Sequence, residues 1–288
     1  MLYNILMKDF KSLDGDNMKH ERIYLNENDK RVFIDTYVAN SKEKRPSILV
    51  IPGGGYSNVC TEREGEPIAL DFFARGYNAF VLNYRVGKDS DVYPSQLFDA
   101  ALAMIYIRKN ADELSVDPKR VFAVGFSAGG HLCGCLATMY AYPEIKREFA
   151  DDSELIKPTG AILSYPVTIA NGSTHQGSFL RLLGKPLSEY TEGEINKLSL
   201  DRAVTSDTAP MFIWHTAEDA VVPVIGSLML AEALTNAKVP YKMSIYPYGP
   251  HGVALSNDLT RCGNDAWVQP LAEGWTREAD EWMKTLCI

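Results

Sequence analysis

The feature that most constrains this chain is an alternation of short, strongly apolar runs with longer segments of helical period. Six runs rich in β-branched residues have the length of buried strands. They are 48–51, 79–83, 121–125, 161–164, 211–215 and 242–246. Five other segments have the period of helices: 67–75, 95–110, 127–140, 224–237 and 266–286. This alternation predicts an α/β fold with a mostly parallel central sheet and helices on both faces.

The rest of the chain fits one domain spanning residues 1–288, because no linker, repeat or low-complexity tract divides it. Two amphipathic runs, 21–25 and 31–38, come before the first buried strand, and we expect them at an antiparallel edge of the sheet. The segment 166–207 is polar, with a weak apolar pattern and several glycines. Loops of that length are usually functional, so we interpret it as a candidate lid or substrate wall; a surface insertion is the alternative.

Composition excludes several classes of partner and location. The 29 basic and 37 acidic residues give a net charge of −8, which argues against nucleic acid as a partner. Charged residues (Lys8, Asp9, Lys11) interrupt the N-terminal region, so the sequence does not support a secretion signal. The uncharged stretch 121–143 contains several glycines and is interpreted as a buried strand and helix, not a membrane span. Five cysteines without CxxC spacing indicate reduced thiols and predict a cytoplasmic protein without a zinc site.

The most informative motif is Gly125-Phe126-Ser127-Ala128-Gly129, between an apolar strand and an uncharged helix. A nucleophile on a strand-to-helix turn adopts a strained backbone, and small neighbours let adjacent chain approach it. The position of the motif therefore predicts Ser127 as a nucleophile. A glycine-rich turn with an incidental serine is the alternative.

A serine nucleophile needs a histidine base and a carboxylate that orients it. His251 lies in a loop just beyond the strand that ends at Tyr246, where it can reach the carboxyl edge of the sheet. The other histidines are less well placed: His215 ends its own strand, His131 lies one helical turn after the serine, and His20 and His175 lie in polar stretches.

The acid is expected just after the strand that contains Trp214, where Glu218 and Asp219 are adjacent. We favour Asp219, because a short side chain suits a tight turn. The chain order is then serine, acid, histidine, which is the order of an α/β-hydrolase.

Acyl transfer also needs donors for the oxyanion, and a run of backbone amides without side chains supplies them. Pro52-Gly53-Gly54-Gly55-Tyr56 follows a strand and provides such a run. We assign the oxyanion hole to the amides of Gly54, Gly55 and Ala128. Tyr56 is a candidate wall of the acyl pocket, with a plain core role as the alternative. A phosphate-binding loop is disfavoured because the glycine pattern and lysine that it needs are missing.

Over about residues 30 to 288 the chain resembles the α/β-hydrolase superfamily, and within it bacterial esterases with a His-Gly-Gly-Gly oxyanion motif, closest to the acetyl-xylan-esterase-like group. Five segments carry the resemblance: 52–56, 76–85, 125–132, Asp219 with Val222-Pro223, and 249–252. The resemblance implies Ser127 as nucleophile, His251 as base, Asp219 as acid and amides of Gly54, Gly55 and Ala128 as oxyanion hole. Pro52 stands where many relatives have histidine, so the hydrogen bonds of that histidine are absent here.

These observations predict a cytoplasmic serine esterase that removes a short acyl group from a carbohydrate. The expected acyl group is acetyl, and an acetylated xylo-oligosaccharide is an example of the expected substrate. Neither a metal nor an organic cofactor is expected. The expected partner is a small ester, with no nucleic acid and no membrane. The alternatives are a general carboxylesterase, a serine peptidase of similar fold, and a non-catalytic ligand-binding protein on the same scaffold.

Overall fold

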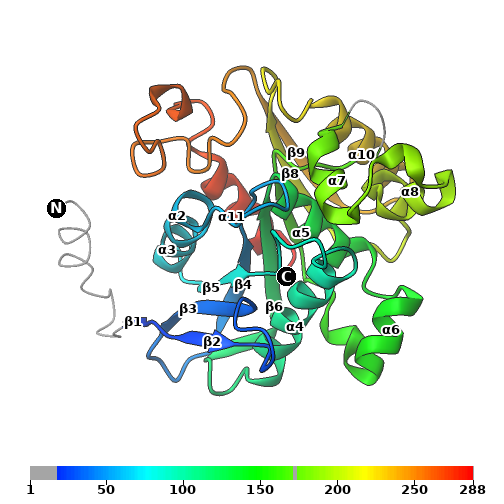
Figure 1. Ribbon diagram of the computed structural model, residues 1–288. Helices are drawn as coiled ribbons and strands as arrows, with labels where there is room; N and C mark the ends of the chain where they lie inside the picture. Colours follow the sequence, from blue (N-terminus) through cyan, green and yellow to red (C-terminus); the bar gives the residue numbers. More distant parts are fainter. Residues whose placement is uncertain (1–17, 171–173, 288) are drawn as a thin grey trace.

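The computed structural model describes residues 18–170 and 174–287, and its centre is a nine-stranded sheet (Figure 1). The strand order is β1-β3-β5-β4-β6-β7-β8-β9, with β2 also pairing with β3. The strands are β1 (Met18–Lys19), β2 (Arg22–Tyr24), β3 (Phe33–Ala39), β4 (Arg45–Ile51), β5 (Asn78–Asn83), β6 (Val116–Phe126), β7 (Ala161–Ser164), β8 (Met211–Thr216) and β9 (Tyr241–Tyr246). All pairs from β5 through β9 are parallel, whereas β3 pairs antiparallel with β1, β2 and β5.

The predicted α/β-hydrolase architecture is confirmed. Each of the six apolar runs is a strand, and the run 161–164 coincides with β7. The two earlier amphipathic runs correspond to β2 and β3, and they lie at the antiparallel end of the sheet, as predicted. Because β4 to β9 are parallel, their carboxyl ends lie along one edge, where ligands bind in folds of this kind.

Helices cover both faces of the sheet. Figure 1 shows α3 and α11 on one side and α4 and α5 on the other. The helices are α2 (Thr61–Glu64), α3 (Glu66–Ala74), α4 (Ser95–Lys109), α5 (Ala128–Thr138), α6 (Pro143–Phe149), α7 (Gln176–Leu183), α8 (Glu192–Leu198), α9 (Leu200–Ala203), α10 (Ile225–Asn236) and α11 (Trp275–Thr285), with 3-10 turns η1 (Ala150–Leu155), η2 (Leu187–Glu189) and η3 (Asp265–Trp267). No helix among residues 18–170 and 174–287 is long and apolar enough to cross a membrane.

The core has two layers because successive strand residues point to opposite faces. In β4, Ile48 and Val50 pack with α3 and α11, where Phe72 and Trp275 are fully buried. Leu49 belongs to the other layer, with α4, α5 and α10. Every central strand is buried on both faces, which explains the continuous apolar runs in the sequence.

The expected single helix 266–286 is wrong in its first half. Only η3 and α11 are helical there, and helix α11 begins after Gly274. Pro270 has no amide to donate, and the amide of Gln269 bonds the carbonyl of Ser256 at 2.8 Å instead of a helical partner. The chain therefore turns back across the surface before the last helix starts.

The segment 166–207 is more helical than its weak apolar pattern indicates. It contains α7, α8, α9 and η2, while residues 171–173 lie outside the described residues. Helix α8 starts with a capping box in which Thr191 and Glu194 satisfy each other's amides. The Thr-x-x-Glu pattern can be recognised in the sequence. The helices themselves are too short for a helical period of apolar residues to be detected.

Candidate active site

Ser127 occupies the turn between β6 and α5. Its backbone has φ 54° and ψ −117°, a conformation that non-glycine residues rarely adopt. Ser127 and the strands beside it are buried, yet its side chain lines an open cavity at the carboxyl edge of the sheet. Such strain at a functional residue persists only where the surrounding structure holds it in place.

Close packing explains the glycines on either side of Ser127. A Cβ on Gly125 would lie 2.1 Å from the carbonyl oxygen of Gly129, and one on Gly129 would lie 2.2 Å from that of Ile51. Both contacts are with backbone, which cannot move aside. The Gly-x-Ser-x-Gly pattern is thus required by the approach of α5 to β4 and β6.

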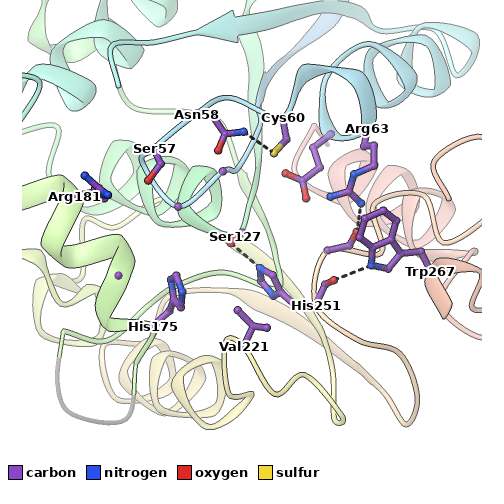
Figure 2. A pocket seen from close by; sticks show the side chains of 15 residues that line it. Ser57, Asn58, Cys60, Arg63, Ser127, His175, Arg181, Val221, His251 and Trp267 are labelled. Carbon is purple, nitrogen blue, oxygen red and sulfur yellow. Dashed lines mark hydrogen bonds between the residues drawn. The ribbon is translucent and has the colours of Figure 1, made fainter. Parts of the chain in front are cut away.

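The three residues expected to form a triad lie in one hydrogen-bonded line, of which Figure 2 shows the bond between Ser127 and His251. The hydroxyl of Ser127 donates to His251 Nε2 at 2.8 Å, and His251 Nδ1 donates to Asp219 Oδ2 at 2.6 Å. Each comes from a loop after a different strand: β6, β9 and β8. Glu218 instead accepts the amide of Gly249 at 3.2 Å, so the acid that contacts His251 is Asp219.

Asp219 is a buried anion with several donors. Its Oδ1 accepts the amides of Val221 and Val222 at 2.9 and 2.8 Å, and its Oδ2 accepts from both His251 and His215. Burial alone would raise the pKa of Asp219, but the hydrogen bonds from the two histidines, the charge of His251 and the Val222 amide outweigh it. The pKa is held well below its ordinary value, so the carboxylate is ionised whenever His251 is charged.

His215 supports Asp219 from behind. Its Nε2 lies 3.2 Å from Asp219 Oδ2 and 2.9 Å from the carbonyl oxygen of Val222, and both of these atoms are acceptors. Nε2 therefore carries the hydrogen, and Nδ1 accepts from Ser227 Oγ at 2.9 Å. The sequence placed His215 only as a strand end; its contact with Asp219 follows from the i, i+4 spacing across the turn.

The oxyanion loop is held by residues that the sequence did not single out. The amide of Gly53 donates to Glu64 Oε2 at 2.8 Å, and Tyr84 donates its hydroxyl to the carbonyl oxygen of Pro52 at 2.8 Å. These two bonds fix both ends of the first peptide of the loop. The two bonds hold the loop at Pro52, the position at which relatives with the His-Gly-Gly-Gly motif have a histidine.

Gly54 and Gly55 line the cavity beside Ser127, and Ala128 is the first residue of α5. No acceptor in the part of the chain that the structure describes bonds the amide of Gly54 or Gly55. The amide of Ala128 lies at a helix start, where N–H groups have no intrahelical partner. The assignment of these three amides to an oxyanion hole stays a prediction that this geometry permits.

Glu64 also connects the oxyanion loop to the histidine side of the site. Its side chain is buried, and Oε1 accepts the hydroxyl of Tyr165 at 2.8 Å. Tyr165 in turn accepts the amide of Ala254 at 3.0 Å, and its ring packs edge-on against His251 at 5.1 Å between centroids. One carboxylate thus holds Gly53 and, through Tyr165, the loop that carries His251.

Tyr56 lies elsewhere than expected. Its side chain is only 3% exposed, is absent from the described lining of the cavity, and donates to His131 Nδ1 at 2.7 Å. His131 Nε2 donates to the carbonyl oxygen of Leu198 at 2.8 Å, and its ring packs against Phe179. The expected pocket wall is therefore a core contact that joins the glycine loop to the segment 166–207. Burial lowers the pKa of His131 to about 4, so it is neutral.

The cavity above Ser127 has a volume of about 510 Å³. Figure 2 shows His175 and Arg181 on one wall and Arg63 and Trp267 on the opposite wall, with Ser127 and His251 between them. Two of these wall residues, with Gly177, belong to the segment 166–207. His175 was not predicted to be part of the site, because it follows no strand in the sequence. Burial lowers its pKa, and the nearby charge of His251 adds to that effect.

Within residues 18–170 and 174–287, no group of three or more His, Cys, Asp or Glu side chains is arranged to hold a metal ion. All five cysteines are free. His20 lies between the edge strands β1 and β2, where its Nδ1 bonds the carbonyl oxygen of Thr36 at 2.9 Å.

Comparison with known proteins identifies the family of the chain. The family model described as BD-FAE matches residues 34–234. Endo-1,4-beta-xylanase B of Butyrivibrio fibrisolvens is 42% identical over 225 residues, which cover 77% of this chain and 34% of the relative. Acetylxylan esterase of Xylanibacter ruminicola is 31% identical over 210 residues, covering 72% of this chain and 40% of the relative. The chain therefore spans less than half the length of these two relatives.

Among solved structures, the acetyl ester-xyloside bifunctional hydrolase from Caldicellulosiruptor lactoaceticus superposes with a TM-score of 0.79. It is 32% identical, and the match covers 92% of this chain and 96% of that one. The carboxylesterase Cest-2923 from Lactobacillus plantarum has a TM-score of 0.78 at 26% identity, covering 93% and 97%.

Proposed function

The chain belongs to the BD-FAE family of α/β-hydrolases, and from that premise we propose that it is a serine esterase that removes short acyl groups, acetyl above all, from carbohydrates. The observation that carries the proposal is the hydrogen-bonded line Ser127, His251 and Asp219 beneath an open cavity. The nucleophile and the base are within proton-transfer distance without any rearrangement.

The proposed reaction has two halves. His251 Nε2 takes the hydroxyl proton as Ser127 Oγ attacks the ester carbonyl, and the amides of Gly54, Gly55 and Ala128 receive the negative oxygen. His251 then gives that proton to the leaving alcohol as the C–O bond breaks, which leaves an acyl-serine. Water attacks the acyl carbon, gives a proton to His251, and releases the carboxylic acid as Ser127 recovers its proton. Asp219 stabilises the protonated imidazole in both halves.

The lining of the cavity supports a short acyl group and a polar alcohol. Val221 and Trp267 are its large apolar side chains, while the other walls present glycines and polar groups such as Ser57 and Asn58. A long acyl chain gains about 0.8 kcal/mol for each methylene that an apolar wall covers, and among the described lining residues Val221 and Trp267 are the large apolar side chains that could cover one. The names of the xylanase, acetylxylan esterase and acetyl ester-xyloside relatives add support for a sugar alcohol.

A general carboxylesterase without carbohydrate preference is the second candidate, favoured by the likeness to Cest-2923. A non-catalytic binding protein is weaker, because the side chain of Ser127 lines the cavity and is already bonded to its base. A serine peptidase of similar fold is weaker because relatives of the chain are named esterases. We also propose that the protein works in a reducing compartment such as the cytoplasm, which the five free cysteines support. The proposed reaction needs no cofactor.

The test measures acetate released from acetylated xylo-oligosaccharides, together with hydrolysis of p-nitrophenyl acetate, butyrate and octanoate, by the wild type and Ser127→Ala. We expect kcat/KM to fall from acetate to octanoate, and acetate release from the sugar to disappear in Ser127→Ala. Activity on aryl esters alone would support the general carboxylesterase. Absence of Ser127-dependent turnover on every substrate would contradict the esterase proposal.

A further inference from the structure

Arg63 is held in a fixed position at the rim of the cavity. Its Nη1 donates to the carbonyl oxygen of Gly252 at 2.6 Å, and its guanidinium carbon lies 3.7 Å from the ring centroid of Trp267. Trp267 is itself anchored, because its indole nitrogen donates to the carbonyl oxygen of His251 at 3.1 Å. The guanidinium is therefore preorganised next to the loop that carries the base (Figure 2).

The guanidinium of Arg63 has no direct ion-pair partner among the described residues. Among the described residues, no carboxylate forms an ion pair with Arg63, and no group accepts from its Nε or Nη2. Glu64, its neighbour in the chain, has both carboxylate oxygens engaged by Gly53 and Tyr165. Its Nε and Nη2 groups therefore remain as N–H donors at the rim of the cavity, with the geometry that suits a carboxylate.

The place of Arg63 also indicates which part of an ester it meets. His251 protonates the leaving alcohol, so the alcohol lies on the side of His251 during the first half-reaction. Arg63 and Trp267 bond the backbone of residues 251 and 252, which puts them on that side. The glycine loop, where the acyl carbonyl oxygen is received, faces α7 instead: a Cβ on Gly55 would meet Ser178 Oγ at 3.9 Å.

We propose that Arg63 binds a carboxylate on the alcohol part of the substrate, so that the preferred substrates are acyl esters of acidic alcohols such as a sugar unit that carries a uronic acid. This inference rests on the proposed esterase function and specifies its substrate class. The planar guanidinium offers two N–H groups to the two carboxylate oxygens, and partial burial against Trp267 strengthens the interaction.

Arg181 on the opposite wall provides a matched comparison. It lies on α7, is exposed, and has no ion pair with any described residue. No hydrogen bond to a described residue fixes its guanidinium in place, and solvent screens its charge. Arg181 is therefore expected to attract anions weakly and at a distance, whereas Arg63 binds them at a defined point.

The test compares two acetate esters of similar shape, 4-acetoxybenzoate and 4-acetoxybenzamide, which differ in the charge on the alcohol part. The readout is the ratio of their kcat/KM values, each divided by the rate of hydroxide-catalysed hydrolysis so that intrinsic reactivity cancels. We expect the wild type to favour the carboxylate by about 10-fold to 100-fold, the range of a hydrogen-bonded charge pair. Arg63→Gln is expected to bring the ratio close to one, while Arg181→Gln changes it less than about threefold.

An inhibition assay, a pair of sugar substrates and a control variant test the role of Arg63 independently of the Arg63→Gln protein. Competitive inhibition of the wild type by 4-hydroxybenzoate should be tighter than by 4-hydroxybenzamide and should weaken with salt, and it needs no variant to fold. Acetylated xylo-oligosaccharides with and without a uronic acid substituent test the sugar itself. Arg277→Gln, the same charge change on α11, should leave the ratio as in the wild type.

Equal rates on the two benzoyl compounds with Ser127-dependent turnover, or an unchanged ratio in folded Arg63→Gln, would overturn the role of Arg63 and leave the esterase proposal standing. Loss of Ser127-dependent turnover on both esters would instead contradict the esterase function itself.

Discussion

Replacing Glu64 by glutamine tests how the oxyanion loop is held. The carboxylate accepts the Gly53 amide and the Tyr165 hydroxyl, both at 2.8 Å and both buried. Glutamine has nearly the same shape, but only one of its two terminal atoms is an acceptor. In Glu64→Gln one of the two donors therefore faces an NH₂ group, and the remaining bond loses its charge assistance.

The expected loss of stability follows from these two changes. Leaving one buried donor without its acceptor costs about 1–3 kcal/mol, and weakening the other bond adds about 1 kcal/mol, so we expect the free energy of unfolding to fall by about 2–4 kcal/mol. For a chain of 288 residues that corresponds to a decrease in Tm of about 3–7 °C. Because the Gly53 peptide leads directly to the oxyanion amides, kcat should also fall about 10-fold to 100-fold, with a smaller change in KM.

Differential scanning calorimetry and steady-state kinetics on p-nitrophenyl acetate measure both effects. Glu62→Gln is the matched control: it makes the same chemical change on the same short helix, but Glu62 is exposed, and its Tm should move by less than about 2 °C. A Glu64→Gln protein with wild-type Tm and kcat would refute the reasoning, since it would mean that neither buried hydrogen bond positions the loop.

Other predictions concern the triad, the buried histidine and the cavity walls. Asp219→Asn should lower kcat roughly 10⁴-fold, because an asparagine amide facing Nδ1 favours the wrong tautomer of His251; kcat within tenfold of the wild type would contradict this. His131 has a folded pKa of about 4, below the unfolded value of about 6.5, so the unfolded chain binds the proton more readily and stability falls as pH decreases between these values. Between pH 7 and 4.5 the wild type should therefore lose about 2 kcal/mol more than His131→Gln in urea unfolding, and equal losses would exclude the effect. Val221→Ala should leave the rate on p-nitrophenyl acetate within about threefold, because an acetyl group is too short to need that wall; a loss beyond tenfold would indicate that the acyl group packs there.

The fold was predictable because each central strand is buried on both faces, so its sequence is an uninterrupted run of apolar residues. The run 161–164 and β7 agree residue for residue for that reason. The Ser127 turn was predictable because close packing at Gly125 and Gly129 leaves no alternative to glycine. The helix expected at 266–286 failed because Gln269 uses its amide for a contact distant in sequence, which local periodicity does not record.

The supporting residues of the site were not predictable, since their partners are far away along the chain. Glu64 lies in a charged run that is typical of a solvated surface, and only the fold brings Tyr165 and Gly53 to it. His175 follows no strand, and it reaches the cavity because α7 folds over the sheet edge. Tyr56 adjoins the glycine loop in sequence, yet its side chain points into the core toward His131.

The most direct measurement of the nucleophile is to trap the acyl-enzyme. The wild type is mixed with p-nitrophenyl acetate, quenched with acid during the first turnovers, digested and analysed by mass spectrometry. We expect a single acetyl group on the peptide that contains Ser127, and a burst of p-nitrophenolate equal to the enzyme concentration where deacylation limits turnover. Acetylation of a different residue, or turnover by Ser127→Ala at the wild-type rate, would contradict the assignment of Ser127 as the nucleophile.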